Sequence, residues 1–132
     1  MPHLLLGALA AAVAFTPPPA ANPVLGTWTN PKHTLAVRTT PCGDRLCGVI
    51  VWAAPQALAD AKDAGVAGLV GTELLQDYRN AGRGSWSGRV FVPDMGRSFS
   101  SHLKQSAPDQ LTISGCLVAG FFCRSQDWRR VP

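Results

Sequence analysis

The chain has 132 residues and four cysteines, and its formal charge of +4 comes from basic residues that are scattered rather than clustered. This length fits one domain with a modest core. Scattered charge gives only a general attraction to anionic surfaces and lacks the basic stripe that nucleic-acid binding needs, so we expect no nucleic-acid partner.

The N-terminal segment predicts a secretory signal peptide over residues 1–21, with a single domain over residues 22–132. Residues 1–21 carry no Lys, Arg, Asp or Glu, and Leu4 to Phe15 is an unbroken run of apolar and small residues that ends at a proline break. The run is too short to cross a bilayer, so we expect no membrane span after processing. A membrane anchor and a buried first helix are the alternatives. We therefore expect export to the periplasm or the extracellular space.

Three strand-like segments follow. Residues 24–30 predict a short strand that the Asn30-Pro31 turn signal ends. Residues 34–40 and 46–53 alternate or run apolar on either side of a turn and predict a hairpin. If Cys42 lies opposite Cys47, the apolar face of this hairpin consists of Leu35, Val37, Ile50 and Trp52.

The middle of the chain is less regular. Residues 54–71 are rich in Ala and Gly, and within them residues 56–63 predict about two turns of helix before the glycines favour a loop. Residues 73–78 fit a strand or a helix, and residues 80–84 predict a loop. An insertion of this length is long for a hairpin connection.

A second hairpin is predicted from residues 85–92 and 97–104, which flank the turn Pro93-Asp94-Met95-Gly96. Pairing Val92 with Arg97 places apolar residues of the two strands opposite each other on one face. The opposite face carries polar residues. The predicted inward pairs are Trp86 with Leu103, Gly88 with Ser101, and Val90 with Phe99.

The last hairpin is predicted from residues 111–130, which alternate around the turn signal Ala119-Gly120. This turn puts Cys116 directly opposite Cys123. One face is largely apolar and the other polar, as expected of a sheet that covers a core on one side. The apolar face consists of Leu111, Ile113, Leu117, Phe122, Trp128 and Arg130.

The cysteines form two close pairs that each flank a turn, so we expect the disulfides Cys42–Cys47 and Cys116–Cys123 in an oxidising compartment. The alternative is a zinc site built from both pairs. Their spacings are not CxxC, and the histidines are scattered, so we expect no metal and no cofactor.

Successive hairpins of seven or eight short strands predict an all-β fold. The favoured architecture is a small up-and-down antiparallel β-barrel with one short helix or loop insertion, because closure removes both exposed edges. A two-sheet β-sandwich is the alternative.

Gly26-Thr27-Trp28, together with Arg130, resembles the GxW-and-arginine pattern of the lipocalin/calycin superfamily. The resemblance implies a barrel with one closed end, where the arginine covers the tryptophan. A guanidinium stacked on an indole would contribute about 0.5–2 kcal/mol there. We expect Gly26, Trp28, Trp128 and Arg130 to be structural residues of this plug.

A longer resemblance is to the exported, lipocalin-like domain-of-unknown-function family number 2147, over nearly all of residues 22–132. Two departures are Arg89, where a second glycine is usual, and Phe99, where a tyrosine is common. The family has no established activity, so the resemblance implies fold and compartment only. The matching blocks are Gly26-Thr27-Trp28, Cys47-Gly48-Val49-Ile50-Val51-Trp52, Trp86-Ser87-Gly88-Arg89, Pro93-Asp94-Met95-Gly96-Arg97-Ser98-Phe99, Gly115-Cys116 and Arg124-Ser125-Gln126-Asp127-Trp128-Arg129-Arg130.

No catalytic constellation is predicted, and we expect no enzyme. Gly84 to Gly88 is superficially similar to GxSxG, but its central residue is Trp86 rather than serine. His102 shares a predicted polar face with Ser87, so a Ser–His pair is one reading and an exposed histidine on a strand is the other.

Binding of a small apolar ligand in the barrel lumen is the main functional hypothesis. Its alternatives are a lumen filled by side chains, and a ligand-free module for protein–protein contacts or envelope structure, in which residues 54–71 would be a docking loop or lid. The candidate lumen residues are Trp52, Trp86, Phe99, Leu103, Ile113, Arg124 and Gln126.

Overall fold

The structure is a computed structural model that describes residues 23–118 and 121–132. Within these residues the chain forms eight strands and one helix. The predicted signal peptide and the turn at residues 119–120 lie outside the described residues. The elements are β1 (Gly26–Thr29), β2 (Leu35–Cys42), β3 (Arg45–Ala53), α1 (Pro55–Asp63), β4 (Glu73–Gly82), β5 (Ser85–Val92), β6 (Arg97–Ala107), β7 (Gln110–Val118) and β8 (Phe121–Arg130).

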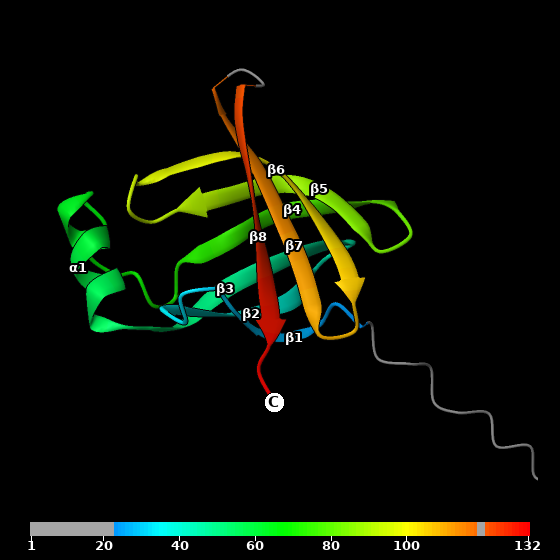
Figure 1. Cartoon of the computed structure of the whole chain (residues 1–132), viewed down its shortest axis with the longest axis horizontal. Helices are drawn as coiled ribbons and strands as arrows, with labels where there is room; N and C mark the ends of the chain where they lie inside the picture. Colours follow the sequence, from blue (N-terminus) through cyan, green and yellow to red (C-terminus); the bar gives the residue numbers. More distant parts are fainter. Residues whose placement is uncertain (1–22, 119–120) are drawn as a thin grey trace, which may run out of the picture.

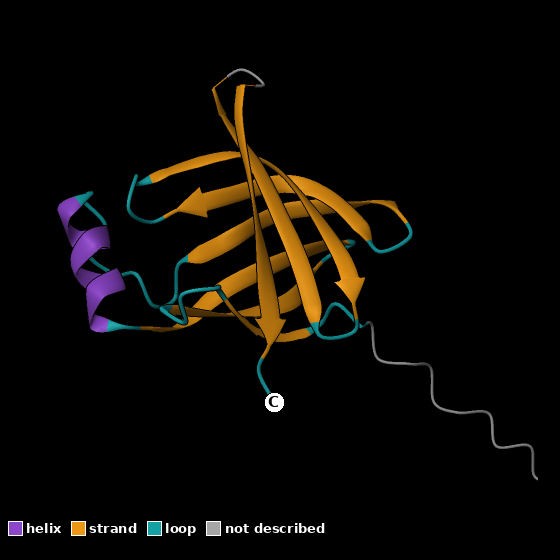
Figure 2. Ribbon diagram, viewed as in Figure 1, coloured by secondary structure: helices purple, strands orange, loops and turns teal. Residues whose placement is uncertain are grey.

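The eight strands form a closed barrel in chain order, and every neighbouring pair is antiparallel (Figures 1 and 2). The predicted up-and-down barrel is confirmed, and the β-sandwich is excluded. The turn after β2, the turn after β4 and the C-terminal end of β8 lie at one end of the barrel, which we call the closed end. The loop after β1, helix α1 and the β5–β6 turn lie at the other end, which we call the open end.

Two predicted hairpin registers are confirmed. Between β5 and β6, Val92 pairs with Arg97 and Val90 pairs with Phe99. Between β7 and β8, Cys116 pairs with Cys123. In both hairpins, the turn residues in the sequence and the alternation of apolar residues predict the same register, and such agreement specifies the strand pairing.

The register predicted for the β2–β3 hairpin is wrong. Cys42 pairs with Arg45 and Thr40 pairs with Cys47, so the disulfide joins diagonal neighbours. Farther along, Val37 pairs with Ile50 but Ala36 pairs with Trp52, which leaves Val51 as the extra residue of a β-bulge. Because one extra residue reverses the alternation of faces, Trp52 points outward and is 49% exposed instead of lining the lumen.

Strand β4 includes residues 80–82, which were expected to be loop. It also contains a bulge, since Gln76 pairs with Arg89 whereas Arg79 pairs with Ser87. Asp77 at this bulge has a positive φ of 50°. The bulge turns Tyr78 into the core, where its side chain is fully buried.

The closed half of the barrel is filled by side chains. Its largest buried members come from six strands, and they pack into one cluster with Val24 and Leu69. The strand residues that fill the closed half are Trp28, Val37, Leu46, Ile50, Leu75, Tyr78, Leu103 and Leu111.

In the described residues, no helix is long and apolar enough to cross a membrane.

The closed end is sealed by Trp28 and Arg130, as the GxW resemblance implied. The Arg130 guanidinium lies 4.3 Å from the centre of the Trp28 ring and donates hydrogen bonds to the backbone carbonyls of Leu25 (2.9 Å), Pro108 (3.1 Å) and Pro23. A side chain at Gly26 would collide with this guanidinium. The glycine of the motif is therefore required by the close approach of the arginine.

Candidate functional site

A cavity of about 580 Å³ occupies the open end of the barrel, above the filled half. Apolar side chains from six strands form its inner wall. Loop residues, α1 and the β5–β6 turn form its rim. The apolar inner wall consists of Leu35, Leu74, Val90, Phe99, Ile113 and Trp128.

Four of the seven predicted lumen residues line this cavity: Phe99, Ile113, Arg124 and Gln126. Leu103 is buried within the filled half, and Trp86 is partly buried and packs against that core. These two, like the outward-facing Trp52, do not line the cavity. Trp128 was assigned to the plug rather than to the pocket, but it lies on the cavity wall, and its indole N–H donates to the side-chain oxygen of Gln126 at 3.1 Å.

Helix α1 and the β5–β6 turn together cover part of the cavity mouth. Pro55 begins the helix, where its fixed φ and missing N–H are tolerated. Gln56, Ala57 and Asp60 line the cavity from the helix. A Cβ at Gly96 in the β5–β6 turn would lie 2.8 Å from the carbonyl oxygen that follows α1, so the turn and the end of the helix are in close contact. The sequence predicted the helix, and residues 54–71 were considered as a lid or a docking loop, but no residue pattern indicated the contact with the β5–β6 turn.

The loop between β1 and β2 is organised by Asn30, a residue for which only the turn signal of Asn-Pro was noted. Its side-chain oxygen accepts the backbone N–H of Thr34 (2.8 Å) and of Leu35 (2.9 Å), and its amide donates to the Thr34 hydroxyl (2.7 Å). The same loop contains His33, whose φ is 54°, and Lys32, which lines the cavity.

Tyr78 is the one polar side chain at the centre of the filled half whose hydroxyl has no hydrogen-bond partner within the described residues. Burial raises the pKa of this phenol, and the nearby Ser101 hydroxyl offsets part of that rise. Ser101 itself donates to the carbonyl of Ser114 at 2.7 Å. The Tyr78 hydroxyl does not line the cavity, so it is a buried group below the site rather than a contact for a ligand.

Ser87 and His102 meet on the outer wall of the barrel. The Ser87 hydroxyl lies 3.0 Å from Nδ1 of His102, across paired positions of β5 and β6. His102 is exposed, and no carboxylate contacts its ring among the residues that the structure describes. The pair therefore lacks the third group that orients the base in a catalytic triad.

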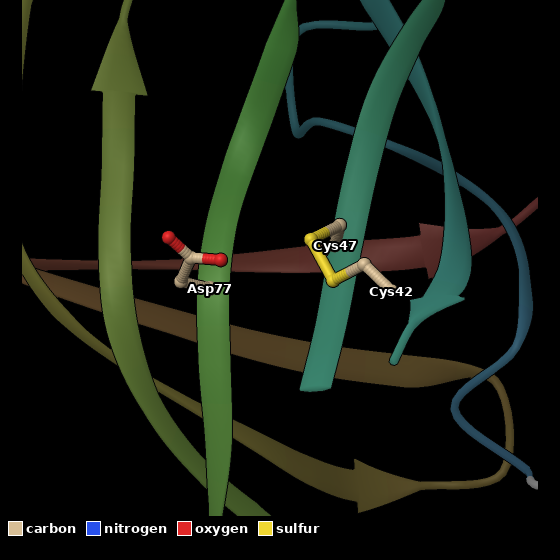
Figure 3. A group of neighbouring side chains, drawn as sticks. All are labelled: Cys42, Cys47 and Asp77. Carbon is tan, nitrogen blue, oxygen red and sulfur yellow. A yellow bond between two sulfur atoms is a disulfide. The ribbon is translucent and has the colours of Figure 1, made fainter. Parts of the chain in front are cut away.

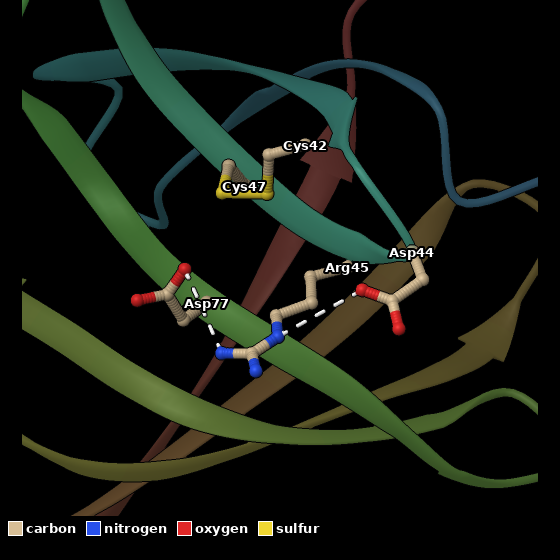
Figure 4. The surroundings of a disulfide bond; sticks show 5 residues. All are labelled: Cys42, Asp44, Arg45, Cys47 and Asp77. Atoms are coloured by element: carbon tan, nitrogen blue, oxygen red, sulfur yellow. Dashed lines mark ion pairs between the residues drawn. A yellow bond between two sulfur atoms is a disulfide. The ribbon is translucent and has the colours of Figure 1, made fainter.

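Both predicted disulfides are present, Cys42–Cys47 near the closed end and Cys116–Cys123 at the open end. Figure 3 shows Asp77 beside the first of them, with its carboxylate within 4.8 Å of both sulfurs. The sulfurs are bonded to each other and offer no thiolate to a metal. The carboxylate of Asp77 instead faces Arg45 at 4.0 Å, and Arg45 also lies 3.9 Å from Asp44 (Figure 4).

Comparison with known proteins agrees with this architecture. Residues 26–130 match the family model described as "Uncharacterized protein conserved in bacteria (DUF2147)". The fold is similar to the solved structure of protein HP1028 from Helicobacter pylori, which is described as belonging to the lipocalin family, with a TM-score of 0.61, 13% identity and 82% of each chain covered. At this identity the likeness shows a shared fold. No curated protein of described function matches the chain.

Proposed function

From the premise that this chain belongs to the DUF2147 family of uncharacterized bacterial proteins, we propose that it is an exported protein that binds a small lipophilic molecule in the cavity at the open end of its barrel. The single observation that carries the proposal is the cavity of about 580 Å³ with an apolar inner wall. This volume lies within the range of pockets that enclose small ligands, about 300–1,000 Å³.

The division of the barrel into a filled and a hollow half supports the same conclusion. Side chains fill the closed half around Trp28 and Tyr78, so the alternative of a wholly filled lumen applies to that half alone. Around the cavity, Phe99, Ile113 and Trp128 offer apolar surface that water solvates poorly. A lipophilic molecule placed there removes this surface from water, at about 25 cal/mol per Å² of apolar area.

Export is supported by the two disulfides, because cystines persist in oxidising compartments. Each closes a short loop and is expected to contribute on the order of 2 kcal/mol on the chain-entropy model. The predicted signal peptide over residues 1–21 fits this compartment. A protein with the signal peptide removed, recovered from the periplasm of an expression host, would establish this part of the proposal.

The binding test uses delipidated protein and Nile red, an uncharged lipophilic dye whose emission rises in an apolar site. We expect saturable uptake, with energy transfer from Trp128, and native mass spectrometry of undelipidated protein should show an added lipid-like mass. Ile113→Trp places a larger side chain in the cavity and is expected to abolish uptake. Ser114→Trp adds the same bulk at the neighbouring outward position and should leave uptake unchanged.

Absence of uptake in a folded protein, together with a clean mass, would refute ligand binding. An equal loss of dye uptake in Ile113→Trp and Ser114→Trp would show that the dye binds outside the cavity. Either result favours the ligand-free interaction module, for which the test is a pull-down that depends on residues 54–71.

A further inference from the structure

The wall of the cavity is not a continuous sheet between β8 and β1. Closure between β1 and β8 rests on two residue pairs, Trp28 with Arg130 and Thr29 with Arg129, although β8 begins at Phe121. The loop that follows β1 and the middle of β8 both line the cavity. Among the described residues no strand pairing joins these two segments, and we call this part of the cavity wall the β8–β1 seam.

The charged residues on the cavity rim are arranged by sign. Four charged residues line the cavity: Lys32, Asp60, Asp94 and Arg124. Following the strand order around the barrel, Arg124 on β8 is succeeded by Lys32 on the β1–β2 loop, then by Asp60 on α1, then by Asp94 in the β5–β6 turn. The two bases thus belong to the segments on either side of the β8–β1 seam, and the two acids belong to α1 and the β5–β6 turn, which cover part of the cavity mouth.

The two bases are also available for a ligand. Among the described residues neither Lys32 nor Arg124 makes an ion pair or a side-chain hydrogen bond, and both side chains are exposed on the rim. The acid nearest to Lys32 in this order, Asp60, accepts a hydrogen bond from the side chain of Gln56 at 2.8 Å. Lys32 belongs to the loop that the hydrogen bonds of Asn30 organise.

We propose that the ligand is a single-chain amphiphile with an anionic head, whose chain lies in the apolar cavity and whose head lies in the β8–β1 seam between Arg124 and Lys32. This inference rests on the proposed function and names its ligand class. A head in the seam stays in contact with water, so its charge is not desolvated, and the chain alone enters the apolar part of the site. The guanidinium of Arg124 presents paired donors to a carboxylate or phosphate, and the ammonium of Lys32 adds a point charge from the other side.

The test compares three amphiphiles that share one chain and differ in head charge: dodecanoate, dodecanol and dodecyltrimethylammonium, each below its micelle concentration. Binding to delipidated full-length mature protein is measured by isothermal titration calorimetry. We expect dodecanoate to bind roughly tenfold more tightly than dodecanol, because its charged head can accept hydrogen bonds from both bases, although their exposure to water weakens these bonds. The cationic ligand should bind most weakly, and added salt should reduce the preference for dodecanoate.

Variants then assign the preference to the seam. Arg124→Gln and Lys32→Gln should each reduce the ratio of dodecanoate affinity to dodecanol affinity several-fold. Lys62→Gln is the matched control, because Lys62 lies at the same end on α1 and does not line the cavity. Dodecanoate and dodecyl phosphate are compared to learn whether the head is a carboxylate or a phosphate.

The outcomes separate this inference from the proposed function. Binding of dodecanol with equal or weaker binding of dodecanoate would overturn the anionic head and leave ligand binding in place. A preference for dodecanoate that persists in both seam variants, or that falls equally in Lys62→Gln, would overturn the placement of the head in the seam. Failure of all three amphiphiles to bind would overturn both proposals.

Discussion

Trp28 and Arg130 are expected to act as one unit in closing the barrel, so their substitutions should not be additive. The indole of Trp28 is buried, and the guanidinium of Arg130 lies 4.3 Å from the centre of its ring. The same guanidinium donates hydrogen bonds to the carbonyls of Leu25, just before β1, and of Pro108, in the turn between β6 and β7. Removing the ring leaves the arginine without the surface on which it is positioned.

The size of the effect follows from these contacts. Trp28→Ala leaves a large cavity in the core and should cost about 3–5 kcal/mol of unfolding free energy. Arg130→Ala removes the ring contact, worth up to about 2 kcal/mol when shielded from water, together with hydrogen bonds to carbonyls that water can partly replace. Because the ring contact is lost in either single variant, the double variant should be about 1–2 kcal/mol less destabilised than the sum of the two.

The assay is guanidinium denaturation of oxidised protein followed by far-ultraviolet circular dichroism, which does not depend on the tryptophan that is removed. Arg129→Ala is the matched control, because this neighbouring side chain is 59% exposed and pairs with Asp109 at 3.6 Å. Its coupling to Trp28→Ala should be near zero. Additive losses for Trp28 and Arg130, or an equal coupling for Arg129, would show that the arginine does not depend on the ring.

Further predictions concern the core and the bulges. Because burial raises the pKa of Tyr78, the only tyrosine in the chain, the contribution of this phenol to the unfolding free energy should be constant below about pH 10 and fall above it. Tyr78→Phe should remove this decline, and ultraviolet titration together with denaturation at each pH checks both expectations. Gly88→Ala should lower the unfolding free energy by about 1–3 kcal/mol, because a Cβ there would lie 2.7 Å from the Tyr78 ring. Gly115→Ala is the control, since its Cβ would meet ordinary 3.6 Å contacts and should be tolerated. Equal melting temperatures of the two variants would contradict the crowding at Gly88. Trp52→Ala should lower the unfolding free energy by under about 1 kcal/mol, because this side chain is exposed, whereas Trp128→Ala removes a buried ring and should lower it by about 3–5 kcal/mol. A larger loss for Trp52→Ala than for Trp128→Ala in a denaturation experiment would show that Trp52 lies inside the barrel.

The fold could be predicted from the sequence because most of its strands are joined by short turns whose chemistry and flanking alternation agree. The β5–β6 and β7–β8 hairpins show this, since their registers follow from the turn residues and the apolar positions together. The two disulfides could be predicted for the same reason, although Cys42 and Cys47 occupy diagonal positions on β2 and β3 rather than directly paired ones.

The candidate site was predicted only in part because β-bulges reverse the alternation from which inward residues were assigned. One extra residue at Val51 turns Trp52 outward, and nothing in the run Val49 to Trp52 marks that position. Likewise, no residue pattern in the sequence marks the bulge at Asp77. The placement of α1 over the mouth depends on tertiary contact with the β5–β6 turn, for which local pattern carries no signal.

The β8–β1 seam also constrains the order in which this barrel can be completed as the chain folds. Strand β1 is the first of the eight strands and its partner β8 the last, so the ring closes only when these distant segments meet. The β2–β3 and β5–β6 hairpins need only local contacts and can form earlier. A chain in which β8 has not yet paired with β1 would therefore hold a nearly finished sheet with two unjoined edges, a state prone to pair with other chains.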